Sequence, residues 1–161
     1  MQKPFGTVSA LSLSYYILSY VPSSQLKLQK LVYYSEGWHL AYFEQSIIPE
    51  DFEAWVHGPA IRELWDHYKG RGTMLTEYYI KPERIDKIRS YFNHVLNPQQ
   101  IEMLNDVIKE YGDKSAYHLE ALTHGEKPWK EARKGYSHSQ RSEVVISKKT
   151  MKTFYQELLA Q

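Results

Sequence analysis

Residues 26–70 constrain the fold most, because they combine an apolar helical pattern with a concentration of large aromatic side chains. Within residues 26–42, apolar side chains recur at spacings of three and four, which is typical of a helix. They cover more than half of its circumference, so we expect this helix to be central. Aromatic side chains bury the most area per residue. We therefore expect Trp38, Trp55 and Trp65, three of the four tryptophans, to be core residues.

The segment after this helix contains the expected β structure. Apolar and polar residues alternate from Phe52 to His57, which predicts a short strand. Gly58 and Pro59 then predict a turn, with Pro59 at the first position of the next helix, where its missing N–H is harmless. Residues 74–80 are also β-prone, and we expect them to pair with the first strand.

Local start signals predict the remaining helices. Side chains of Ser, Thr and Asn can accept a hydrogen bond from a first-turn amide, and proline is tolerated at the first helical position. Such signals stand at Thr7 or Ser9, Ser23 or Ser24, Asn97-Pro98, Ser115, Pro128 and Ser147. We expect a mainly α (α+β) fold, a compact helical domain with one small β-hairpin-like element, forming a single domain over residues 1–161. Gly37 inside the central helix predicts close packing of a neighbouring helix.

Composition excludes several classes of protein. The 20 basic and 19 acidic residues give a net charge of +1, which offers no electrostatic case for binding nucleic acid or an anionic membrane. The chain has no cysteine, so disulfides, thiol catalysis and cysteine-based zinc sites are excluded. This fits a reducing cytoplasm, where we expect the protein to act. No apolar run approaches the roughly 20 residues that span a bilayer.

Sequence motifs for catalysis are absent. There is no His-Glu-x-x-His, no Gly-rich phosphate loop and no Gly-x-Ser-x-Gly. Glu36 and His39 have the spacing of a di-iron ligand pair, but no second Glu-x-x-His accompanies them. We therefore expect no enzymatic activity, no cofactor and no metal site. The alternative is a small metal-dependent or hydrolytic enzyme, which would use His39, Glu53, His57 and His124.

Lys30 projects from a mostly apolar face of the predicted central helix. A lysine in this position reaches solvent or pairs with a carboxylate. We expect a structural ion pair with Glu53 or Asp51, which form an acidic run beside the predicted turn. Contact with a partner is the alternative role for Lys30.

Four motifs follow one another between residues 24 and 133: Leu28-Gln29-Lys30-Leu31, Phe52-Glu53-Ala54-Trp55, Gly58-Pro59, and Leu122-Thr123-His124 with Pro128-Trp129. Any one of them is a weak signal. In this order and at these spacings they resemble the SocA-like family, also called the Panacea antitoxin domain, which includes prophage-associated GepA-type proteins.

The resemblance implies a mainly helical domain with a small β element and no known catalytic residues. It also implies an antitoxin of a toxin–antitoxin system, which binds and neutralises a cognate toxin. The alternative is a protease adaptor that delivers its bound partner to a Clp-type protease. Many members of the family carry a further region that partners a different toxin, whereas we expect this chain to be the bare domain.

Loops on a rigid scaffold often carry contacts, so we expect partner binding near Gly58-Pro59 and along residues 123–129. The candidate residues are Lys30, Glu53, His57, His124, Lys127 and Trp129. The last third of the chain is also basic, with Trp129 and Tyr136 interleaved, as in some single-strand binders. We do not expect nucleic-acid binding, because no groove-reading motif accompanies these residues.

Overall fold

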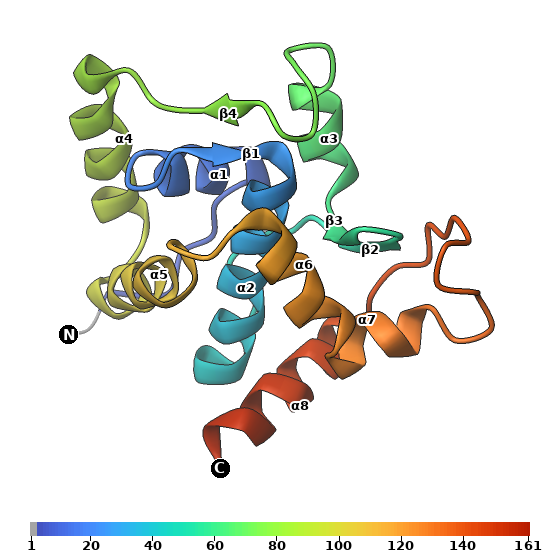
Figure 1. Cartoon of the computed structure of the whole chain (residues 1–161). Helices are drawn as coiled ribbons and strands as arrows, with labels where there is room; N and C mark the ends of the chain where they lie inside the picture. Colours follow the sequence, from blue (N-terminus) through green and yellow to red (C-terminus); the bar gives the residue numbers. More distant parts are fainter. Residues whose placement is uncertain (1–2) are drawn as a thin grey trace.

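The computed structural model describes residues 3–161 and confirms a mainly helical fold. Eight helices occur within these residues: α1 (Ala10–Leu18), α2 (Gln25–Phe43), α3 (Arg62–Tyr68), α4 (Pro82–Val95), α5 (Pro98–Tyr111), α6 (Ala116–His124), α7 (Lys127–Ala132) and α8 (Lys148–Leu159). The strands form two-stranded antiparallel sheets: β1 (Ser23–Ser24) with β4 (Glu77–Tyr78), and β2 (Glu53–Trp55) with β3 (Gly58–Ala60). Figure 1 shows their arrangement.

Helix α2 lies at the centre of the molecule, as its sequence pattern predicts. Helices α1, α5, α6 and α8 contact it from different sides. Its side chains are buried around most of the circumference, including Leu31, Tyr33 and Tyr34 at 0% exposure. Gly37 allows α8 to come close, because a Cβ atom there would lie 2.6 Å from Cε2 of Tyr155. This confirms the close packing expected at Gly37.

Helix starts follow the local signals of the sequence. Ser24 accepts from the amide of Lys27 and so caps α2, while Asn97 and Gln100 form a reciprocal capping box at the start of α5. Three more serines accept first-turn amides in the same way: Ser9, Ser115 and Ser147. These caps depend on neighbours in the sequence, which explains why their prediction is confirmed.

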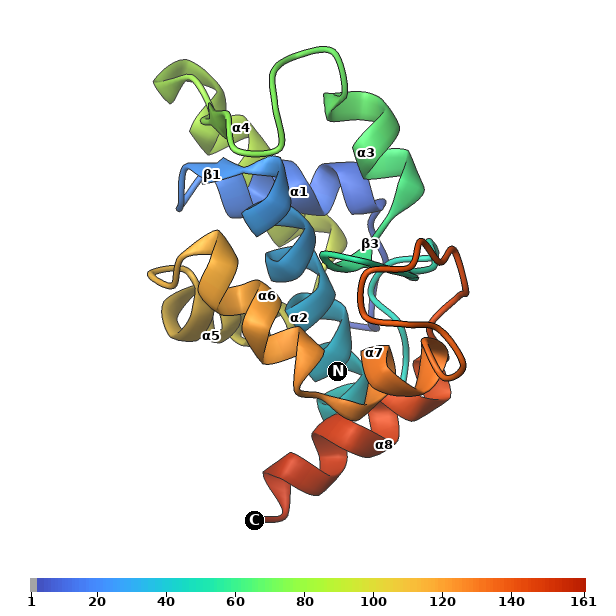
Figure 2. The same ribbon diagram turned by 45° about the vertical axis from the view of Figure 1, so that its right-hand side comes forward.

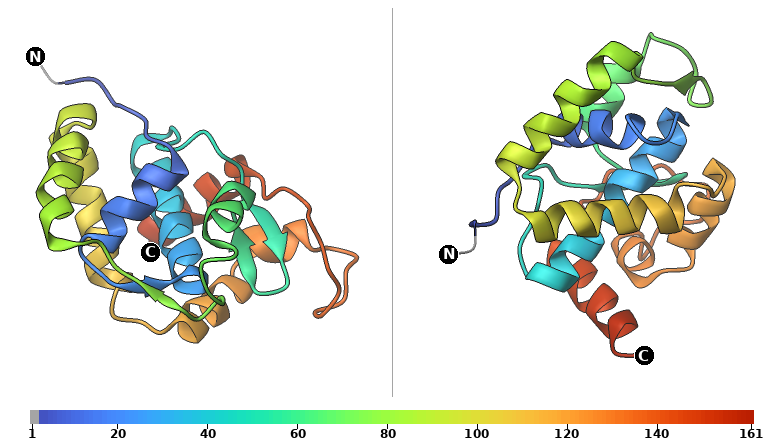
Figure 3. Two further views of the ribbon diagram at one scale, coloured as in Figure 1. Left: turned by 90° about the horizontal axis from the view of Figure 1, so that it is seen from above. Right: turned by 90° about the vertical axis from the view of Figure 1, so that its left-hand side faces the viewer.

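The predicted strand pairing is wrong. Strand β2 pairs with β3, with Trp55 opposite Gly58, and β4 pairs instead with β1. The turn of the β2–β3 hairpin is formed by Val56 and His57, and Gly58 follows it with φ of +103°. A two-residue connection closes a hairpin with less loss of chain entropy than pairing with residues 74–80 would require. Figure 3 shows the two sheets in separate parts of the molecule.

Pro59 lies inside β3 and not at the start of α3, which begins at Arg62. A proline in a strand removes one donor from the sheet. Its partner Ala54 is bonded elsewhere, since the Ala54 amide donates to the Val144 carbonyl at 2.8 Å. The segment between α7 and α8 therefore acts as the outer neighbour of β2, and Figure 2 shows this segment beside the hairpin.

Within the part of the chain that the structure describes, no helix has both the length and the apolar character needed to cross a bilayer.

Candidate functional site

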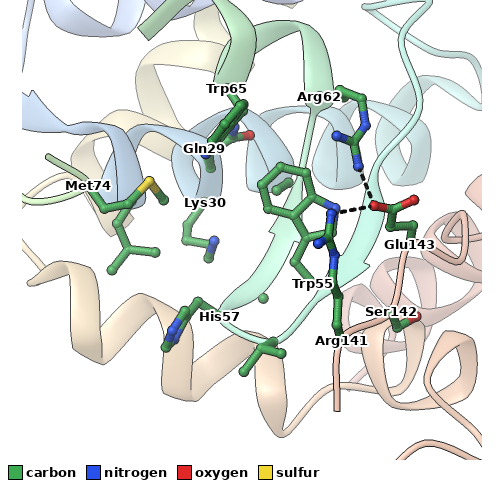
Figure 4. A pocket seen from close by; sticks show the side chains of 14 residues that line it. Gln29, Lys30, Trp55, His57, Arg62, Trp65, Met74, Arg141, Ser142 and Glu143 are labelled. Carbon is green, nitrogen blue, oxygen red and sulfur yellow. Dashed lines mark hydrogen bonds and ion pairs between the residues drawn. The ribbon is translucent and has the colours of Figure 1, made fainter. Parts of the chain in front are cut away.

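A pocket of about 460 Å³ opens beside the β2–β3 hairpin. Its lining is mostly apolar and comes from α2, the hairpin, the start of α3, Met74 and residues 141–143. These segments are distant in sequence and meet because α2 packs against β3 and α3. Figure 4 shows the side chains around the opening. Apolar concave surfaces with a few placed polar groups are the usual form of a binding site.

Two tryptophans form the wall of this pocket. Trp55 projects from β2 and Trp65 from α3, and their ring centroids lie 6.3 Å apart with the rings close to perpendicular. Both side chains are half-buried and lie outside the main hydrophobic cluster, which Trp38 contacts from its edge. The expectation that Trp55 and Trp65 are core residues is therefore wrong. The short β2–β3 hairpin holds Trp55 at the surface instead of turning it inward.

Charged side chains form one rim of the pocket. Arg62 donates to Glu53 at 2.9 Å and lies 3.1 Å from Oε1 of Glu143, while its guanidinium stands 5.2 Å from the Trp55 ring centroid. The Trp55 indole also donates to Glu53 at 2.8 Å. Partial burial opposes ionisation of Glu53, but these donors outweigh it and lower its pKa. Arg141 completes the rim by pairing with Glu143 at 2.9 Å.

Lys30 lies at the floor of the pocket, from α2. Its side chain is 1% exposed, and its ammonium donates to the carbonyl of Pro59 at 3.1 Å. The predicted ion pair of Lys30 with Glu53 or Asp51 is wrong, because Glu53 is bonded to Arg62 and Trp55. Burial lowers the pKa of Lys30 to about 7, and the charge of Glu120 opposes this shift. The ammonium is thus buried without a matched carboxylate.

Gly58 allows the hairpin to approach Lys30. A Cβ atom at this position would lie 2.7 Å from Cε of Lys30 and 2.9 Å from Oγ1 of Thr123. Its φ of +103° also falls in the left-handed region that favours glycine. The neighbouring Gln29 fixes the start of α3, since its amide exchanges two hydrogen bonds with the backbone of Ile61, at 3.0 and 2.8 Å. Lys30 and Gln29 therefore join α2 to the segment from Gly58 to Ile61.

His57 stands at the tip of the hairpin. It is exposed, and its Nδ1 atom lies 3.0 Å from Oε1 of Glu120 on α6. This contact joins the hairpin tip to α6 on the side away from Arg62. His57 is therefore an accessible polar group of the pocket lining.

His124 and Trp129 support the hairpin from behind. Trp129 is 5% exposed, and its indole donates to the Trp55 carbonyl at 2.8 Å. The His124 ring stacks on Trp129 with centroids 4.0 Å apart, and burial lowers the pKa of His124. The buried Arg133 donates to the Ala54 carbonyl at 2.9 Å. Residues 123–129 thus span the end of α6 and the start of α7 and hold β2 in place.

Lys127 is the one candidate that lies apart from this pocket. It is exposed at the start of α7 and lines a shallow groove shared with α8, beside Phe154. Of the six predicted contact residues, Lys30 and His57 line the hairpin pocket, and Glu53 joins its rim through Arg62. His124 and Trp129 reach the pocket through the hairpin backbone.

The residues named for the enzyme alternative do not form one site. His39 is buried in α2, where its ring nitrogens contact the Gln45 carbonyl at 2.6 Å and the Gln100 amide at 3.0 Å. Burial lowers the pKa of His39 to about 4. Across residues 3–161, no three or more side chains of His, Cys, Asp or Glu gather as metal ligands would.

Sequence reasoning missed four pocket residues: Trp55, Arg62, Trp65 and Glu143. Arg62 and Trp65 are one helical turn apart, and this spacing beside the hairpin could have indicated a shared face. Glu143 carries no such signal, because it follows a polar segment far along the chain. Only the packing of residues 141–146 against β2 brings it to the rim.

Comparison with known proteins gives one match. A family model described as antitoxin SocA-like, Panacea domain, matches residues 28–130. The matched region begins in α2 and ends in α7, so it contains the hairpin and most of the pocket. No curated protein and no solved structure matches the chain.

Proposed function

The chain belongs to the SocA-like antitoxin, Panacea domain family, and on this premise we propose that it is an antitoxin that neutralises a toxin protein by binding it directly. The observation that carries the proposal is the hairpin pocket, whose walls are Trp55 and Trp65 and whose rim includes Arg62. Tryptophan and arginine are the residue types most enriched where protein interfaces gain most of their affinity.

The pocket has the composition of an interface centre. The two tryptophans supply apolar area, and the charges of Arg62, Glu53 and Glu143 stand at the edge. Protein interfaces combine an apolar centre with a polar rim in the same way. We expect the apolar part of a toxin side chain to lie against Trp55 and Trp65, while the rim fixes its orientation.

The hairpin offers a rigid surface for this contact. Trp129 and Arg133 bond the backbone of β2 from behind, and the Val144 carbonyl accepts from the same strand. Because these bonds form without the toxin, little ordering is needed on binding, which favours affinity. His124 and Trp129 would act as positioning residues, whereas Lys30, Glu53 and His57 would meet the toxin itself. The proposed mechanism is occlusion of the toxin's active surface in the cytoplasm.

The test begins with tagged protein isolated from its native host and mass spectrometry of what binds to it. Each captured protein is then expressed alone and together with this chain in a growth assay. We expect one small partner to arrest growth alone and to be harmless when co-expressed. The proposal fails if no captured protein arrests growth, or if co-expression leaves the arrest unchanged.

Two variants connect the growth assay to the pocket. Trp65→Ala should abolish rescue while the protein stays folded, because Trp65 is half-buried at the pocket wall. Tyr91→Ala, on the exposed side of α4, should rescue like the parent. The amount of toxin in rescued cells separates mechanisms: occlusion leaves it unchanged, whereas an adaptor for a Clp-type protease lowers it.

A further inference from the structure

The Lys30 ammonium is buried with most of its bonding capacity unused. An ammonium carries three N–H donors, and the Pro59 carbonyl accepts one of them. Within residues 3–161, no carboxylate pairs with Lys30. Buried charges are ordinarily paired, because an isolated ion in an apolar environment is costly. The remaining donors of Lys30 lie at the floor of a pocket that opens to the surface.

The other charges of the pocket are already matched. Arg62 is bonded to Glu53 and Glu143, and Arg141 is bonded to Glu143. Glu120, which acts on Lys30 only at longer range, is bonded to His57. Among the described cations that line the pocket, Lys30 alone lacks an anion. One unmatched cation calls for one negative charge and not for the double charge of a phosphate.

We propose that the hairpin pocket receives a carboxylate on Lys30, presented by an acidic side chain of the toxin whose aliphatic stem lies against Trp55 and Trp65. The apolar walls can contact the aliphatic stem, and Lys30 at the floor can pair with the carboxylate. A charge-assisted hydrogen bond of this kind is stronger in a desolvated pocket than at an exposed surface. The identity of the carrier rests on the proposed function, whereas the carboxylate site itself does not.

The chemistry of the site can be tested on the isolated protein with two probes of equal shape. 4-Phenylbutyrate carries the carboxylate, and 4-phenylbutanamide replaces it with a neutral amide. We expect the acid to bind about tenfold more tightly or better, because losing one member of a buried charge pair commonly has at least this effect. Tryptophan fluorescence gives the two dissociation constants. Equal binding of acid and amide would overturn the carboxylate site.

Two lysine variants assign the effect to Lys30. Lys30→Met keeps the length of the side chain and should remove the preference for the acid. Lys27→Met is the matched control on the same helix, since Lys27 is partly buried and donates to the Gly112 carbonyl. The preference of this variant for the acid over the amide should equal that of the parent. Retention of the preference in Lys30→Met would overturn the assignment. The 13Cε resonance of Lys30 in lysine-labelled parent protein gives the same answer without a variant, because its titration should move to higher pH when the acid binds.

The growth assay tests the carrier separately. We expect Lys30→Met to lose rescue from the toxin and Lys27→Met to keep it. If the acid preference is present but Lys30→Met rescues fully, the toxin does not supply the carboxylate. If no toxin is found, the proposed function fails while the probe measurements still decide the carboxylate site.

Discussion

Two buried charges on α2 have opposite surroundings. Glu36 is 0% exposed; one of its oxygens lies 2.6 Å from Lys148 Nζ and the other accepts from the Ile47 amide at 2.8 Å. Lys148 also donates to the Ile48 carbonyl. Lys30, six residues earlier, is 1% exposed and has a single carbonyl acceptor beneath an open pocket.

The difference shows what a buried charge can do on the same helix. Glu36 joins α2 to the start of α8 and to the segment after α2, so its charge serves the fold. Lys30 joins α2 to β3 by one bond and has no carboxylate partner within residues 3–161, which leaves it open to a group from outside. A buried ion that lacks a partner is unfavourable for stability, and such groups are typical of functional sites.

Removing the partner of Glu36 should have the largest effect on stability. Lys148→Met leaves the Glu36 carboxylate buried without its cation, and we expect a loss of about 3 kcal/mol or more in the free energy of unfolding. Lys149→Met is the control, because Lys149 is exposed on the same turn. Urea unfolding of the three proteins measures the effect. Equal stability of Lys148→Met and the parent would remove the contrast between the two charges.

Adding a side chain at Gly58, where the hairpin packs against Lys30, should have the next largest effect on stability. Gly58→Ala adds strain at a positive φ and places Cβ against Lys30 and Thr123, so we expect a loss of about 2–4 kcal/mol. Gly135→Ala has a similar φ of +91° but nothing within 4 Å of its Cβ. It should lose only about 1 kcal/mol. Thermal unfolding compares the pair, and similar losses would show that the contact with Lys30 is loose.

Glu126 provides a buried carboxylate with hydroxyl partners only. It accepts from Tyr34 at 3.1 Å and from Tyr155 at 2.8 Å, and burial raises its pKa from 4.5 to about 7. Below pH 4.5 the folded and unfolded states both hold the proton. Between pH 4.5 and 7 only the folded state keeps the proton on Glu126. The free energy of unfolding therefore falls as the pH rises through that window.

Glu126→Gln should remove that pH dependence, because the amide oxygen still accepts from both tyrosines and does not ionise. The free energy of unfolding of the variant, minus that of the parent, should increase by about 1–3 kcal/mol as the pH rises from 4.5 to 7. Above pH 7 this difference should stay constant. Urea unfolding at several pH values measures the difference. A difference independent of pH would mean that folding does not change the pKa of Glu126.

Removing the Lys30 charge should have the smallest effect on stability. Lys30→Met loses one hydrogen bond to Pro59, but it also removes the penalty of burying an ammonium. We expect the free energy of unfolding at pH 7 to stay within about 1 kcal/mol of the parent. Comparing its free energy of unfolding with that of Lys148→Met tests the contrast between Lys30 and Glu36. A loss as large as that of Lys148→Met would make Lys30 a structural residue like Glu36.

The sequence by itself determined the central helix and the starts of several helices, but not the start of α3. Ser24, Asn97, Ser115 and Ser147 cap helices because each meets an amide only three residues away. The apolar pattern of residues 26–42 likewise required a helix buried on most sides. The motifs that suggested the family lie within or beside the matched residues 28–130.

Only the tertiary structure decided the strand pairing, the exposure of Trp55 and Trp65, and the surroundings of Lys30. Each depends on contacts between segments that are distant in sequence, such as Arg62 with Glu143. Spacing along the chain carries no information about such contacts, because they arise when whole elements pack together. The sequence therefore indicated that Lys30 is unusual on an apolar helix face, and the packing left it without a carboxylate partner.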